Sequence, residues 1–177
     1  MTDRLVLPVL LRGWDEARGR LDLRLAGLED AEYLDEPLSG AWSVRREDDG
    51  SWTADWAHPA PEPAPVTTIA WRLWHLASGC FADYLAQTPA GRQLALTGRE
   101  WHGDAASALR DLDIAATAFR TAMTDLGEEG MWRPLGPAWG PYSDSSWADL
   151  LVHATDELAH HGAEIALLRD LYRWRWR

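Results

Sequence analysis

The segment from Leu150 to Tyr172 constrains the fold of this chain more than any other stretch. It contains no proline and a single glycine, and its leucines recur at helical spacing, which predicts one long helix. At 3.6 residues per turn, one stripe of this helix begins and ends in leucine and carries histidines and carboxylates in between. Its members are Leu150, His153, Glu157, His160, Glu164, Leu168 and Leu171. A stripe with leucine at both ends is expected to face a core.

The polar groups in this stripe favour a metal site. Burying histidines and carboxylates costs free energy unless they are paired or coordinate a metal. Asp156 and His160 are one turn apart, so both side chains can reach a single ion. The alternative is ordinary pairing of Asp156 with His160 and of Glu157 with His161, which stabilises an exposed helix by roughly 0.2–0.5 kcal/mol per pair. The position of these groups within an apolar stripe favours the metal.

Three further stretches predict long helices. They are Leu5 to Leu28, Val66 to Gln87 and Gly103 to Leu126, each with an apolar face at helical spacing. Together with the last helix, they predict an all-α fold, an up-down-down-up four-helix bundle formed by residues 1–177 as a single domain. Bundles build metal sites from side chains on facing helices.

Residues 30–65 interrupt the helical pattern. Five prolines and two glycines, Gly40 and Gly50, argue against a long helix in this region. Asp49-Gly50 stands between two short runs with β-forming residues, which predicts a hairpin or turn. We therefore expect a long ordered loop with a short hairpin between the first and second helices.

Capping residues mark where the helices begin and end. Thr67 or Thr68 can cap the second helix, Asp104 can cap the third, and Ser146 opens a capping box before the fourth. Gly127 is expected to stop the third helix, because glycine readily adopts the left-handed conformation that follows a helix end.

Composition excludes several classes of partner. The net charge is −11 and all 17 cationic residues are arginine, so neither a nucleic-acid backbone nor an anionic membrane is an expected partner. The alternating Arg and Trp of residues 173–177 are expected at a surface end. No apolar run has the length of a membrane span, and no signal peptide is expected. The single cysteine, Cys80, excludes an internal disulfide, fits a reducing cytoplasm and is expected in a packing role.

His75 is the candidate third ligand. It lies near the middle of the second helix, among Trp71, Trp74 and Leu76. A lone histidine among aromatic residues is more often a hydrogen-bonded core residue than a ligand. Here the last helix already offers a histidine and a carboxylate, and this favours the ligand interpretation.

Two stretches of the sequence resemble a known family. Residues 67–76, TTIAWRLWHL, and residues 156–165, DELAHHGAEI, running into Leu168-Arg169, resemble motifs of the DinB-like superfamily. This superfamily of bacterial four-helix-bundle metalloproteins includes bacillithiol and mycothiol S-transferases and mycothiol-dependent maleylpyruvate isomerases. The resemblance covers essentially the whole chain, and residues 30–65 are the least comparable part. It implies that His75, Asp156 and His160 bind one divalent ion, zinc or nickel, with coordination positions left open.

The resemblance also implies a function. The ion would lower the pKa of a low-molecular-weight thiol such as mycothiol, and the thiolate would attack an electrophilic small-molecule substrate in a transferase or isomerase reaction. A homodimer is compatible with this function. Two alternatives remain open. One is a non-catalytic, stress-associated protein of the same fold that binds a metal or small molecule. The other is a metal-assisted hydrolase with Glu157 or Glu164 as general base.

The chain departs from the family pattern on its last helix. Most members have histidine where this chain has Asp156, and glutamine where it has Ala163. A carboxylate at the first position resembles the mycothiol-dependent isomerases, which have glutamate there. Because aspartate is one methylene shorter than glutamate, His153, Glu157 or His161 remain alternative ligands.

Overall fold

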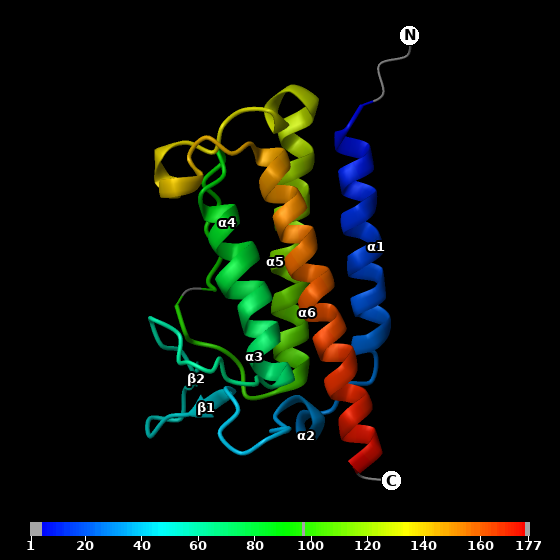
Figure 1. Cartoon of the computed structure of the whole chain (residues 1–177), viewed down its shortest axis with the longest axis vertical. Helices are drawn as coiled ribbons and strands as arrows, with labels where there is room; N and C mark the ends of the chain where they lie inside the picture. Colours follow the sequence, from blue (N-terminus) through cyan, green and yellow to red (C-terminus); the bar gives the residue numbers. More distant parts are fainter. Residues whose placement is uncertain (1–4, 97, 176–177) are drawn as a thin grey trace.

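The computed structural model describes residues 5–96 and 98–175. In this part of the chain, four long helical segments lie side by side (Figure 1). They are α1 (Leu7–Leu25), the continuous run of α3 (Ile69–Trp74), η1 (His75–Ala82) and α4 (Asp83–Ala86), then α5 (Ala105–Met131) and α6 (Trp147–Arg175). In Figure 1, α1 and α6 run downwards, whereas the α3–α4 segment and α5 run upwards. The all-α class predicted from the sequence is confirmed.

Shorter elements connect these segments. They are the single-turn helix α2 (Asp30–Tyr33), the strands β1 (Val44–Arg46) and β2 (Trp52–Ala54), and the 3₁₀ segment η2 (Pro137–Tyr142). The two strands pair antiparallel, so the hairpin predicted around Asp49-Gly50 is confirmed. The hairpin lies beside α3, at the start of the continuous α3–α4 segment, and η2 lies near α4, at the other end of that segment (Figure 1).

The helix starts are capped as the sequence predicts. Thr68 and Asp104 each accept a hydrogen bond from the backbone N–H three residues further on, at 3.2 and 2.8 Å. Ser146 and Asp149 form a reciprocal capping box, at 3.2 Å to the serine hydroxyl and 2.8 Å to the carboxylate. Gly127 does leave the helical conformation, with φ of 66°, but α5 continues beyond it to Met131.

The face of α6 that enters the core differs from the predicted stripe. The residues buried along α6 include Trp147, Leu151, Ala154, Leu158, His161, Ile165 and Arg169. Leu171, one end of the predicted stripe, is 45% exposed, and the His160 side chain is 62% exposed. The prediction that His160 faces the core is therefore wrong, and the buried face lies about one residue further along the chain.

No helix in residues 5–96 and 98–175 is long and apolar enough to cross a bilayer. Of the Arg-Trp tail, Trp174 is 74% exposed, in agreement with the predicted surface end. Trp176 and Arg177 lie outside the described residues.

Candidate metal centre

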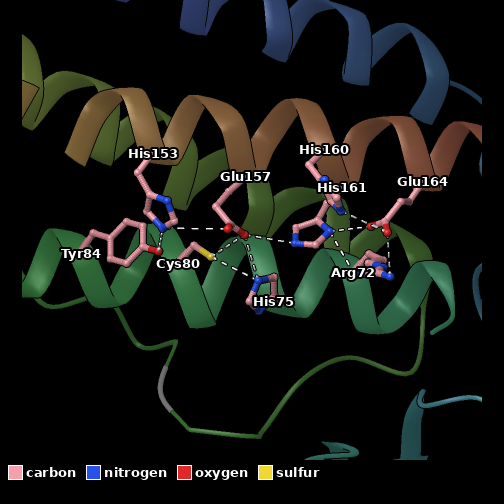
Figure 2. A network of polar contacts seen from close by, with 9 residues as sticks. All are labelled: Arg72, His75, Cys80, Tyr84, His153, Glu157, His160, His161 and Glu164. Carbon is pink, nitrogen blue, oxygen red and sulfur yellow. Dashed lines mark hydrogen bonds and ion pairs between the residues drawn. The ribbon is translucent and has the colours of Figure 1, made fainter. Parts of the chain in front are cut away.

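Three donor atoms from two facing helices, η1 and α6, converge on one another (Figure 2). His75 is the first residue of η1, and Glu157 and His161 lie one turn apart on α6. The Glu157 Oε2 atom is 3.2 Å from His75 Nε2 and 3.1 Å from His161 Nε2. All three atoms lie within 4.8 Å of one another. Histidine, carboxylate and histidine therefore form a potential metal site.

The structure brings together only part of the ligand set expected from the sequence. His75 is in the cluster, but Asp156 and His160 are exposed, and His160 lies instead in a second possible group with His161 and Glu164. Their sequence neighbours, Glu157 and His161, take the two positions on α6. Both residues are among the three alternatives to Asp156 that the sequence left open, the third being His153. His160 instead lies 3.3 Å, Nε2 to Oε1, from Glu164.

A π-helical segment shapes the other side of the site. In an α-helix, residues five apart point about 140° away from each other. The hydrogen bonds of a π-helix reach five residues along the chain, which brings such residues to one side. In η1 this places Cys80 Sγ 3.6 Å from His75 Nε2. Nothing in the sequence predicted this π-helical segment.

The His75 ring has two close neighbours on its own helix. Trp71 stacks on it with a centroid distance of 5.2 Å and an interplanar angle of 11°. A Cβ atom at Gly79 would lie 3.3 Å from His75 Nδ1, so glycine at this position leaves the ring room. In the sequence, Gly79 is the one residue of η1 whose type could have indicated that a side chain lies close to the helix backbone.

A second layer of polar contacts holds His161. Its Nδ1 atom lies 2.6 Å from Glu164 Oε2 and 3.0 Å from Arg72 Nη1. Arg72 can only donate, and it also pairs with Glu164 at 3.0 Å. Because the carboxylate contact is the shorter one, we assign the proton to Nδ1, donating to Glu164. This leaves the Nε2 lone pair directed at Glu157 and available to a metal, an arrangement common behind metal-bound histidines.

The electrostatics of the cluster suit metal ligands. Burial lowers the pKa of His75, and the neighbouring His161 lowers it further, so the ring is neutral at neutral pH. Burial alone would raise the pKa of Glu157, but the hydrogen bond from His75 and the charge of His161 outweigh it and lower the pKa overall. A neutral imidazole and an ionised carboxylate are the forms that bind metals.

Cys80 borders the site but is a protonated thiol. Its side chain is buried, and burial together with the nearby Glu157 carboxylate raises its pKa to about 12. The thiolate is the reactive form of cysteine. The protein's own thiol is thus unsuited to act as a nucleophile at neutral pH, in line with the expected packing role.

The distances from Glu157 to the two histidines are close to those expected around a divalent ion. Ligands about 2.0–2.2 Å from a tetrahedral zinc ion stand about 3.3–3.6 Å apart. The distances from Glu157 Oε2 to the two histidine nitrogens, 3.2 and 3.1 Å, are slightly shorter than this edge. Small movements of the side chains would accommodate the ion, and two imidazoles with a carboxylate form a donor set suited to zinc or nickel.

Comparison with known proteins agrees with this site. A family model described as the DinB superfamily matches residues 14–165, a range that contains all three donor residues, the whole of η1 and α6 as far as Ile165. Comparisons with curated proteins and with solved structures gave no match.

Proposed function

Because the chain belongs to the DinB superfamily, we propose that it is a metal-dependent transferase or isomerase that uses a low-molecular-weight thiol such as mycothiol. His75, Glu157 and His161 would hold one divalent ion, zinc or nickel. The observation that carries the proposal is the convergence of their donor atoms within 4.8 Å. The topology we propose is the up-down-down-up four-helix bundle, with the site between its second and fourth helices.

Three protein ligands are the number typical of a catalytic zinc site, which keeps a position open for a substrate. When bound, the ion supplies positive charge that lowers the pKa of a thiol and favours its thiolate. The residues of this chain would bind the ion and orient its ligands. Glu157 offers one negative charge between His75 and His161, and Glu164 fixes the tautomer and direction of the His161 ring. Arg72 balances the charge of Glu164.

Metal-assisted hydrolysis is less well supported by these contacts. It requires a carboxylate free to take a proton from water. Glu157 lies between two histidines, and Glu164 contacts His161 and Arg72. Both carboxylates expected as general bases are therefore already engaged, which favours a thiol as the nucleophile.

The experiment is a metal analysis followed by a thiol-consumption assay. Protein purified without a histidine tag should contain about one zinc or nickel ion per chain, as a site with three protein ligands predicts. It should consume mycothiol in the presence of an electrophile such as monochlorobimane, lose this activity on chelation and regain it with the ion. Metal without thiol consumption would favour the non-catalytic binding protein. Protein without any metal would contradict the proposal.

A further inference from the structure

The buried thiol of Cys80 lies beside two of the three candidate metal ligands. Its Sγ atom is 3.6 Å from His75 Nε2 and 3.8 Å from Glu157 Oε2, and those two atoms are 3.2 Å apart. Sulfur, nitrogen and oxygen thus form a second triangle of donor atoms, which shares one edge with the triangle completed by His161. Figure 2 shows Cys80 and His161 on opposite sides of the Glu157 carboxylate.

The dimensions of this second triangle suit a tetrahedral metal ion. Bonds of about 2.3 Å to sulfur and about 2.0–2.2 Å to nitrogen or oxygen place the sulfur about 3.5–3.7 Å from each of the other ligands. The two distances from Cys80 Sγ, 3.6 and 3.8 Å, are close to this range. Because the two triangles share two ligands, one ion would complete its coordination with either Cys80 or His161.

The third donor gives the two triangles different chemistry. Soft thiolate ligands favour soft ions, whereas imidazole and carboxylate suit zinc and nickel. His161 already directs its Nε2 lone pair at Glu157, because its Nδ1 proton is donated to Glu164. Cys80 must instead give up its proton to bind, as a coordinating thiol does. The strong bond between sulfur and a soft ion such as cadmium(II) compensates for this loss.

An ion reaches this second triangle from the side of His75 and Glu157. Cys80 is 1% exposed, whereas the side chains of His75 and Glu157 are 24% and 22% exposed. The ion therefore meets the nitrogen and the oxygen first and the sulfur last. The π-helical hydrogen bonds of η1 hold the thiol on the same side as the His75 ring.

We propose that His75, Glu157 and Cys80 form a binding site for soft metal ions, represented by cadmium(II). The ion would bind the Cys80 thiolate as the thiol proton leaves to solvent, with no change of oxidation state. Because it would share two ligands with the zinc or nickel ion of the proposed function, the two ions would exclude each other. This exclusion rests on the proposed function, whereas the cadmium site itself does not.

Cadmium binding to chelator-treated protein, in buffer without added thiol, tests the site. Because Cys80 is the only cysteine of the chain, a sulfur-to-cadmium charge-transfer band in the ultraviolet can come only from this residue. The wild type should show the band, and Cys80→Ser and Cys80→Ala should lose it. Both variants should bind cadmium at least about tenfold more weakly, since even the contacts that support a metal ligand are worth about 10–100-fold in affinity. Ser78→Ala changes another buried side chain of η1 and is the matched control, which should keep the band.

Opposite behaviour of two variants separates the two triangles. Cys80→Ser should keep zinc, because the three proposed zinc ligands remain. His161→Ala should lose zinc but keep about one cadmium ion per chain, together with its charge-transfer band. In the wild type, added cadmium should displace zinc one for one, as measured by inductively coupled plasma mass spectrometry. Circular dichroism would establish that each variant is folded.

The two proposals can fail separately. A wild type without the cadmium band, cadmium binding by Cys80→Ser as tight as by the wild type, or zinc and cadmium bound together would overturn the inference. Loss of cadmium from folded His161→Ala would also overturn it, because both ions would then use the same ligands. A wild type that shows the cadmium band but never holds zinc or nickel would instead contradict the proposed function and support the soft-metal site.

Discussion

Replacing Arg169 with methionine is expected to destabilise the fold more than any surface change. The Arg169 side chain is 1% exposed, and its Nε and Nη2 atoms each donate to a carboxylate oxygen of Glu32 at 2.8 Å. The same guanidinium donates to the carbonyls of Arg24, Ala26 and Gly27, where α1 ends. Methionine keeps the apolar stem and removes every one of these donors.

The expected loss of folding free energy follows from the burial of the Arg169–Glu32 ion pair. Removing one partner of a buried ion pair costs about 3–5 kcal/mol, because the remaining charge is left uncompensated. For a domain of this size, each kcal/mol lowers the melting temperature by about 2–4 °C, so a loss near 4 kcal/mol corresponds to about 8–16 °C.

The assay is thermal and urea unfolding followed by circular dichroism. Arg173→Met, at an exposed position on the same helix, is the matched control and should change the free energy of unfolding by less than about 0.5 kcal/mol. The double variant Glu32→Leu/Arg169→Met should recover part of the loss, because it leaves no unpaired charge. A loss below about 1 kcal/mol for Arg169→Met would refute the reasoning, since it is well under the cost of an uncompensated buried charge.

Two further predictions concern Cys80 and Glu128. Native protein at about pH 8 should resist iodoacetamide at Cys80 and react once unfolded, because burial and Glu157 raise the pKa of the thiol to about 12; rapid labelling of native protein, detected by mass spectrometry, would contradict this. The Glu128 carboxylate accepts the backbone N–H groups of Val6 and Leu7, which lowers its pKa below 4.5, so its stabilisation is present above pH 4.5 and is lost as the pH falls through the lower folded-state value. The difference in urea midpoint between the wild type and Glu128→Gln should therefore shrink on acidification, and a difference that does not change with pH would show that the charge is not responsible.

Local signals in the sequence were sufficient to predict the helices and the hairpin. Thr68, Asp104 and Ser146 cap helices because their side chains bond to backbone groups only a few residues away. The hairpin at Asp49-Gly50 likewise depends on residues close in the chain. Such features need no knowledge of the partner helices.

The orientation of α6 required information from other helices. Leucines lie on more than one side of this helix, and Leu171, which the predicted stripe included, is exposed. A regular spacing of three and four residues does run through Leu151, Ala154, Leu158 and Ile165. This series includes an alanine and, unlike the predicted stripe, does not have leucine at both ends. The same pattern contains His161, so recognising it would have pointed to His161 as the ligand.

Neither the π-helical segment nor the buried ion pair could be predicted from the sequence alone. The position of Cys80 beside His75 depends on the change of hydrogen-bond pattern in η1, which packing against neighbouring helices determines. Arg169 pairs with Glu32, a residue far away in the chain, so helical periodicity alone gave no reason to expect a buried arginine.

Metal content in two pairs of neighbouring variants tests the central claim most directly. His161→Ala and Glu157→Gln remove groups that converge with His75, whereas His160→Ala and Asp156→Asn change the exposed residues beside them. Inductively coupled plasma mass spectrometry should find about one ion per chain in the wild type, His160→Ala and Asp156→Asn, as expected for an intact three-ligand site. It should find the ion lost from folded His161→Ala and Glu157→Gln. Retention of the ion by His161→Ala together with its loss from His160→Ala would contradict the account.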